Sequence, residues 1–131
     1  MSGDESAIRR LLVDYCHLID DGRFDEWILL FNEDVVFTVM GNRLVGRAEL
    51  RGFIEPSQRE GDRGRHLLSE PRIDLDGDTA RVATDYAFVS RSNTILSTGR
   101  YFDTVCRAKD RWCFSSREIV FTGDTPTGLN E

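Results

Sequence analysis

The sequence has few of the residues that usually indicate a nucleic-acid partner, a metal or a nucleotide cofactor. Lys109 is its only lysine, the net charge is −6, and the arginines are spread along the chain. Because phosphate binding needs clustered cations, this pattern argues against a nucleic-acid partner. The only histidines are His17 and His66, and no carboxylates stand at metal-ligand spacing. A glycine-rich phosphate loop is absent too. We therefore expect no metal and no cofactor.

Long apolar runs are also missing. No stretch approaches the roughly 20 apolar residues of a membrane span, and the first residues, MSGDESAIRRLL, contain no apolar core of signal-peptide length. Cysteine is scarce: Cys16, Cys106 and Cys113 make an odd number without metal-type spacing. We expect them to be reduced thiols of a cytoplasmic protein, although Cys106 and Cys113 could face each other across a hairpin.

What is present is enough for one folded core. The chain has 131 residues, of which 40% are hydrophobic and 31% charged, a composition typical of globular proteins. This length suits one domain rather than two. We expect a single domain over residues 1–131, with its core at about 5–122 and a mobile tail, GDTPTGLNE, after residue 122.

Apolar spacing predicts three helices in the first half of the chain. The first has apolar residues at helical spacing, begins near Ser6 and stops at Gly22, a typical residue at a helix C-terminus. Pro56 closes the third. The predicted helices cover residues 6–21, 24–31 and 47–54.

The remaining elements are predicted strands. The central feature is a long hairpin over residues 64–89, whose two strands are joined at Asp76-Gly77-Asp78, because an Asp-Gly pair between β-rich runs is a strong hairpin signal. Further strands are expected over residues 35–40, 43–45, 96–107 and 112–122. Helices followed by a run of strands indicate an α+β domain: a strongly bent antiparallel sheet curls into a cone around the helices and encloses a pocket.

This order of elements resembles the cone-shaped α+β fold shared by nuclear transport factor 2, steroid Δ5-isomerase and scytalone dehydratase. Within that superfamily the chain is similar to the SnoaL-like domains. The resemblance covers residues 5–122 and is specific for fold rather than for reaction. The matching residues are Ala7-Ile8, Tyr15, Asp20-Asp21-Gly22, Leu30 to Phe37, Gly46-Arg47, Arg65-His66-Leu67-Leu68, Asp76 to Ala80, Gly99-Arg100-Tyr101, Asp103, Trp112 and Phe114.

The resemblance implies a catalytic triad of Tyr15, Asp20 and His66. Dehydratases of the superfamily pair a histidine on the first long strand with an aspartate at the end of the first helix, and bile-acid dehydratases add a tyrosine five residues earlier. The residue pattern is compatible, because Tyr15 lies on the apolar side of the helix and Asp20 at its end. Asp20 would orient His66 as a general base, while Tyr15 would stabilise an enolate.

Some residues depart from the relatives. Scytalone dehydratase has a further histidine on a later strand, which this chain lacks. For the base of steroid isomerase the only counterpart is Asp85, which strand alternation places on the outer face. A histidine-based mechanism is therefore the better match.

Strand alternation supplies further pocket candidates. The face of residues 79–90 that carries Tyr86 and Phe88 is the larger and more apolar one, so we expect it to be concave. Arg100, if it points inward, would bind an anionic group of the substrate or a carboxylate. The predicted substrate-binding residues are Arg100, Tyr86, Phe88, Phe37 and Trp27, while Phe31, Phe53 and Trp112 belong to the core or pocket wall.

Together these features predict a cofactor-independent lyase or isomerase, resembling a dehydratase, for a small apolar and cyclic carbonyl compound. The alternative is a non-catalytic ligand-binding or assembly module, similar to the small subunit of ring-hydroxylating dioxygenases. The resemblance also implies a homodimer or higher homo-oligomer. An Asp20–His66 contact that opens onto a cavity would favour the enzyme, and a filled cone would favour the module.

Overall fold

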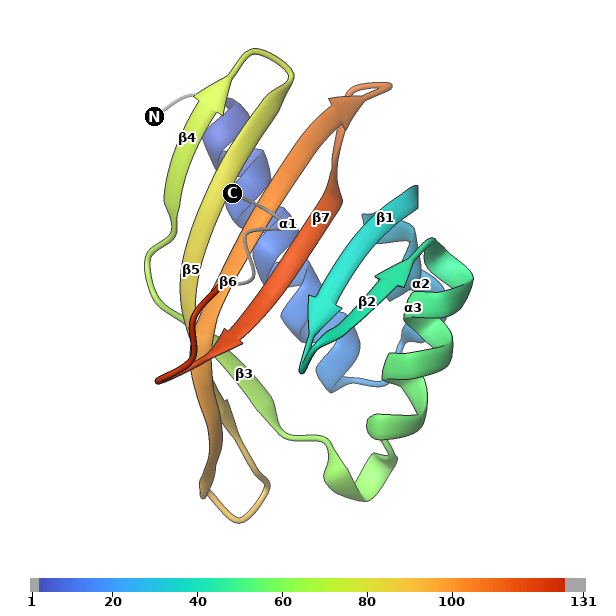
Figure 1. The fold of residues 1–131 in the computed structure, drawn as a ribbon, viewed down its shortest axis with the longest axis vertical. Helices are drawn as coiled ribbons and strands as arrows, with labels where there is room; N and C mark the ends of the chain where they lie inside the picture. Colours follow the sequence, from blue (N-terminus) through green and yellow to red (C-terminus); the bar gives the residue numbers. More distant parts are fainter. Residues whose placement is uncertain (1–2, 127–131) are drawn as a thin grey trace.

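The computed structural model describes residues 3–126, and Figure 1 shows its elements. Three α-helices lie in the first half of the chain and seven strands form one sheet. The helices are α1 (Gly3–Asp20), α2 (Phe24–Trp27) and α3 (Arg47–Ile54), with 3₁₀ turns at Ile28–Leu30, Glu55–Ser57 and Glu60–Asp62. The strands are β1 (Phe31–Val39), β2 (Asn42–Val45), β3 (Arg65–Leu68), β4 (Arg72–Asp76), β5 (Thr79–Val89), β6 (Ile95–Ala108) and β7 (Arg111–Phe121).

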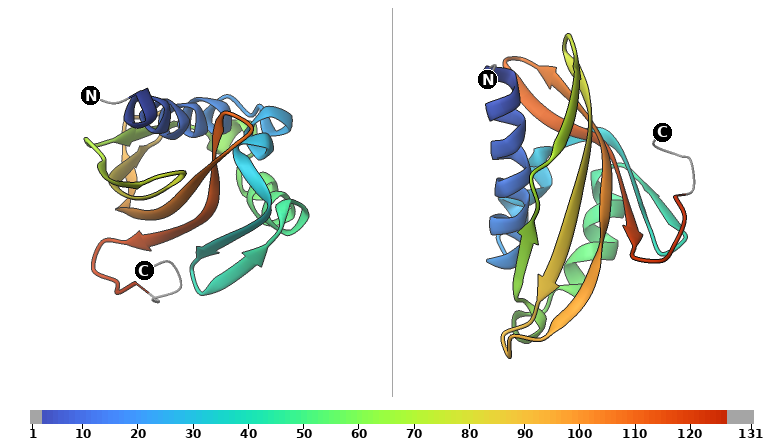
Figure 2. Two further views of the ribbon diagram at one scale, coloured as in Figure 1. Left: turned by 90° about the horizontal axis from the view of Figure 1, so that it is seen from above. Right: turned by 90° about the vertical axis from the view of Figure 1, so that its left-hand side faces the viewer.

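The sheet is curved and does not close. Its strand order is β2-β1-β7-β6-β5-β3. β4 pairs with the same edge of β5 as β3, at the other end of that strand. Figure 2 shows the sheet curving, with α1 lying across its concave side, while α3 packs beside β1 and β2. The apolar side of α1 and the concave side of the sheet form the core. This arrangement confirms the predicted cone-shaped α+β fold.

The predicted helices are confirmed with changes at their ends. The third covers the predicted residues, whereas α1 begins at Gly3, so that Ser6 lies within it. The second helix was predicted too long: its α-helical part ends at Trp27, and one 3₁₀ turn leads into β1 at Phe31. Phe31 pairs with Phe114 of β7, so strand pairing starts where the sequence pattern still favoured helix.

The first strand of the central hairpin was predicted as continuous, but it is divided. Both β3 and β4 pair with β5, and residues 69–71 between them belong to neither strand. Pro71 explains the interruption, because proline has no N–H to give to a ladder. The turn itself is as predicted, with Gly77 at φ 61°.

One strand pair corrects the expectation of an antiparallel sheet. β1 runs parallel to β7, while the other pairs are antiparallel. A parallel pair needs a long connection, and the chain between these two strands supplies it with β2, α3 and four further strands.

Cys106 and Cys113 lie directly opposite each other on β6 and β7, and all three cysteines are free thiols. Between residues 3 and 126, no helix is long and apolar enough to cross a membrane. The tail expected to be mobile starts after residue 122, and its last five residues, 127–131, lie outside the described part of the chain.

Candidate active site

Asp20 is the last residue of α1, and its side chain is buried against the start of β3. Both carboxylate oxygens have a partner in the same residue. Oδ2 accepts a hydrogen bond from the backbone N–H of His66 at 2.8 Å, and Oδ1 lies 2.6 Å from His66 Nδ1. The carboxylate therefore fixes both the backbone and the ring of His66, as the resemblance implied.

His66 is held on three sides. Asp20 lies at its Nδ1, the ring of Phe88 lies 4.7 Å from its own, and the ring of Tyr15 meets it edge-on at 6.5 Å. An ionised carboxylate can only accept hydrogen bonds, so Nδ1 carries the proton when the imidazole is neutral. The side chain is 12% exposed. Its other nitrogen, Nε2, therefore keeps a free lone pair.

Tyr15 lies deeper than the dyad. Its ring is surrounded by other aromatic rings, and its nearest charged group is the guanidinium of Arg117, 4.3 Å from the ring centre. Burial raises the pKa of Tyr15 to about 12, although the charge of Arg117 opposes the shift. The phenol therefore stays protonated at neutral pH and can act as a hydrogen-bond donor.

A cavity of about 260 Å³ opens beside these groups on the concave face. Tyr15 and His66 line it, as do Tyr86 and Phe88 of β5. Most of its other walls are apolar. The remaining lining residues are Ile19, Val39, Met40, Phe53, Ile54, Ser57, Gln58, Ser97, Tyr101, Ile119 and Phe121.

A buried ion pair behind Tyr15 was missed by sequence reasoning. Arg117 of β7 and Asp103 of β6 are both fully buried and make two parallel hydrogen bonds of 2.7 and 2.8 Å. The guanidinium also lies 3.8 Å from the ring centre of Tyr101. Burial by itself lowers the pKa of Arg117, but Asp103 more than offsets this and the pKa is raised. Arg117 therefore stays charged behind the cavity, in a pair with Asp103.

Arg117 was missed because β7 changes phase. Simple alternation from Phe114 puts Ser116 inward and Arg117 outward. An irregularity in the β6–β7 register between Thr104 and Val105 shifts the pairing, so Ser116 pairs with Thr104 and Arg117 with Asp103. Such a β-bulge has no marker in this sequence. The one available signal was Asp103, which shares the inward face of Tyr101 and needs a buried cation.

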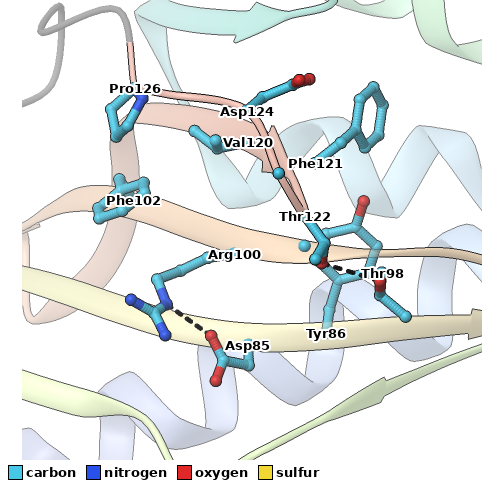
Figure 3. A pocket seen from close by; sticks show the side chains of 12 residues that line it. Asp85, Tyr86, Thr98, Arg100, Phe102, Val120, Phe121, Thr122, Asp124 and Pro126 are labelled. Atoms are coloured by element: carbon cyan, nitrogen blue, oxygen red, sulfur yellow. Dashed lines mark hydrogen bonds and ion pairs between the residues drawn. The ribbon is translucent and has the colours of Figure 1, made fainter.

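Arg100 does not lie in this cavity, which corrects its prediction as a substrate-binding residue and settles the direction that strand alternation left open. Its partner is Asp85, and both side chains are more than half exposed on the outer face of the sheet. Figure 3 shows this ion pair in a separate hollow of about 450 Å³, beside Thr98 and Thr122. Tyr86 and Phe121 line both hollows. The outer one holds no histidine.

Two other predicted substrate-binding residues belong to the core. Phe37 and Trp27 are fully buried, and neither lines the cavity that His66 opens onto. Trp27 packs against Tyr15 and Phe31, so both residues support the cavity from behind. His17 is exposed, as expected. Within residues 3–126, no three His, Cys, Asp or Glu side chains are grouped so that they could hold a metal ion.

A curved open sheet with a long helix across its concave side defines the class of the protein: the nuclear transport factor 2-like form of the cystatin-like fold. The chain belongs to the SnoaL-like domain family, whose model matches residues 2–118. No curated protein matches it.

Three solved structures from Novosphingobium aromaticivorans are similar. A scytalone dehydratase-like protein shares 26% identity over 98% of this chain and 95% of its own, with a TM-score of 0.83. An NTF2-like protein with a cystatin-like fold shares 24% sequence identity over 93% of this chain and 84% of its own, with a TM-score of 0.76. A protein similar to the beta subunit of aromatic-ring-hydroxylating dioxygenases shares 21% sequence identity over 92% of this chain and 89% of its own, with a TM-score of 0.72.

Proposed function

We propose that the protein is a cofactor-independent lyase or isomerase for a small, apolar, cyclic carbonyl compound, and that His66 is its general acid and base. One observation carries the proposal. The carboxylate of Asp20 binds Nδ1 of His66 at 2.6 Å and its backbone N–H at 2.8 Å, and the same histidine lines a mainly apolar cavity. A partly buried, oriented and accessible imidazole is the arrangement that proton transfer requires.

The reaction begins with proton abstraction. Nε2 of His66 takes the proton from a carbon next to the substrate carbonyl, and the electron pair of that C–H bond passes into an enolate. Asp20 stabilises the imidazolium that forms, because a carboxylate attracts the new positive charge. It also keeps the ring in one orientation, so that little rearrangement is needed during the transfer.

Tyr15 acts on the carbonyl oxygen. Its hydroxyl donates a hydrogen bond to the oxygen as negative charge develops there, and the charge of Arg117 behind the ring favours the same state. In a dehydration, the enolate then expels a hydroxyl from the next carbon, and His66 protonates it to give water. In an isomerisation, His66 returns the proton to another carbon.

We also propose where the substrate rests and how the protein works as a whole. Phe88 lies beside the His66 ring, and Tyr86 precedes it by two residues on the same face of β5, so these side chains form the wall on which an apolar ring would lie. Trp27 and Phe37 lie in the core behind Tyr15, where both pack against Phe31. The protein would act in the cytoplasm as a homodimer or higher homo-oligomer.

The second candidate function is a non-catalytic ligand-binding or assembly module. Three apolar side chains at the ends of β3 and β6 favour it, because Leu67, Ile95 and Leu96 are 56–63% exposed. Exposed apolar groups of this kind often mark contacts with another subunit. They are equally suited to a homo-oligomer of the enzyme, so catalysis decides between the two candidates.

Hydrogen–deuterium exchange into a ketone tests the proposal directly. The probe is 2-tetralone, a small bicyclic ketone, whose protons next to the carbonyl are followed by proton NMR in D₂O. Wild-type protein should accelerate their loss, and His66→Ala should reduce the acceleration about 10²–10⁴-fold. The matched control is His17→Ala, which removes the other, exposed histidine and should leave the rate unchanged. If wild type and His66→Ala exchange at equal rates, or if wild type does not exceed the rate in buffer alone, the non-catalytic module is favoured.

A further inference from the structure

A pair of hydroxyl groups interrupts the apolar wall of the cavity. Tyr86 Oη and Ser97 Oγ lie 2.8 Å apart and hydrogen-bond to each other, and both residues line the cavity. Neither residue is needed for the proton transfer described above. Sequence reasoning included Tyr86 as an apolar wall residue but did not include Ser97.

The ring of Tyr86 is fixed in place by two contacts and by the space that a glycine leaves for it. It stacks on Tyr101 with ring centres 4.5 Å apart and planes 5° from parallel, and Ser97 binds its hydroxyl. The cross-strand partner of Tyr86 is Gly99, where an added Cβ would lie 2.9 Å from the tyrosine ring and 2.3 Å from the carbonyl oxygen of Val120. Glycine therefore leaves the room that the ring occupies. A side chain held this firmly is preorganised for binding.

The hydroxyl pair keeps hydrogen-bonding capacity to spare. Two hydroxyls carry two protons, and their mutual bond uses one, so one donor and several acceptor positions remain. Burial raises the pKa of Tyr86, although its bond to Ser97 opposes the shift, so the phenol is neutral. Among the described residues that line the cavity, none is Asp, Glu, Lys or Arg. The cavity therefore suits a neutral ligand with an oxygen at this point.

The sheet register places this pair across the cavity floor from the dyad. His66 pairs with Phe88, and Phe88 pairs with Ser97 on the next strand. Adjacent strands are about 4.8 Å apart, so the backbones of His66 and Ser97 are separated by roughly 10 Å, with Phe88 between them. A flat ring system lying on Phe88 would thus meet a polar group at each end.

We propose that Tyr86 and Ser97 form a second recognition point, and that the substrates are small neutral ring compounds with a hydroxyl or carbonyl oxygen on the side away from the reacting carbon. The assignment of the reacting end rests on the function proposed above. Recognition at the far end requires no turnover, so the two can be tested separately.

The test compares two unreactive probes, 2-naphthol and 2,6-dihydroxynaphthalene, by calorimetric titration. Because one neutral hydrogen bond is added, wild-type protein should bind the diol about fivefold more tightly. Tyr86→Phe and Ser97→Ala should each reduce this ratio to about one and leave the affinity for 2-naphthol within twofold. Thr98→Ala is the matched control, since its hydroxyl binds Thr122 on the outer face, and it should keep the wild-type ratio.

Unchanged ratios in Tyr86→Phe and Ser97→Ala would overturn the proposal, as would equal affinities of wild type for the two probes or no binding of either. Tyr86→Phe keeps the stacked ring, so a folded variant is expected, and thermal unfolding checks this. If the diol preference behaves as expected while 2-tetralone shows no exchange, the recognition point stands and the catalytic proposal fails. Exchange without the diol preference would support the catalytic proposal and overturn the recognition point.

Discussion

The interior of the cone contains two carboxylate pairs that differ in burial and in whether the unused nitrogen of the basic partner reaches the cavity. Arg117 donates hydrogen bonds from Nε and Nη2 to Asp103. Its Nη1 has no hydrogen-bond partner among the described residues, but the guanidinium is buried among aromatic rings and does not line the cavity. His66 gives one nitrogen to Asp20 and lines the cavity. The first pair is closed to ligands and the second is open. Burial of an ion pair therefore does not by itself mark an active site; an unused polar atom at a cavity does.

Tyr15 connects the two pairs. Its ring covers the Arg117 guanidinium on one side and approaches the His66 ring on the other. The Asp103–Arg117 ion pair therefore lies behind Tyr15, the residue proposed to bind the substrate oxygen. The closed pair would support the open one through the tyrosine, without itself touching a substrate.

The largest effect on stability is expected from opening the closed pair. Arg117→Met or Asp103→Leu leaves an unpaired buried charge, which should lower the free energy of unfolding by about 3–5 kcal/mol. The double variant removes both charges and should recover much of the loss. Urea unfolding of the four proteins measures the difference. Additive losses in the double variant would show that the two residues do not stabilise each other as a pair.

A smaller effect is expected from pH. Burial raises the pKa of Tyr15 to about 12, with Arg117 opposing, and burial raises that of Cys16 to about 12 as well. The folded protein therefore keeps protons that the unfolded chain releases at its ordinary values, 10.0 and 9.0. The stability that these two protonated groups contribute is fully present below pH 9 and is lost as the pH rises towards 12.

Tyr15→Phe isolates the part of this loss that belongs to the tyrosine. The variant should remove about 2–3 kcal/mol of the decline between pH 10 and 12, since one pKa unit corresponds to about 1.4 kcal/mol. Denaturant unfolding at several pH values gives the slope. A variant that declines as steeply as wild type would mean that Tyr15 does not retain its proton in the folded protein.

The smallest effect is expected from the exposed pair on the outer face. Arg100→Ala removes the partner of Asp85, and because both side chains are more than half exposed and screened by solvent, the free energy of unfolding should hardly change. Deuterium exchange into 2-tetralone should be unchanged. A large loss of exchange in this variant would move the site from the concave to the outer face of the sheet.

The sequence was sufficient for those features that local patterns encode. The first helix, the turn at Gly77 and the inward face of Tyr86 follow from spacing and turn chemistry. The pairing of Asp20 with His66 was expected from the family resemblance, because the end of one helix and the start of one strand meet in the cone. Contacts that depend on strand register are harder to predict from the sequence.

The failures share that physical origin. Arg117 faces inward only because the β6–β7 pairing changes phase at Thr104, and no residue in the sequence marks that change. The inward or outward direction of Arg100 also depends on where strand pairing begins, and its partner Asp85 lies on a different strand. Pro71 was a readable signal for the division of the first hairpin strand, and its effect was underestimated.

The ring nitrogens of His66 test the central claim most directly. Their ¹⁵N chemical shifts, measured where the ring is neutral, report which nitrogen carries the proton, and exposed His17 serves as an internal reference. The structure predicts that His66 is protonated at Nδ1, toward Asp20, and free at Nε2, toward the cavity. A proton at Nε2, or the same tautomer mixture as His17, would contradict the open pair and with it the proposed general base.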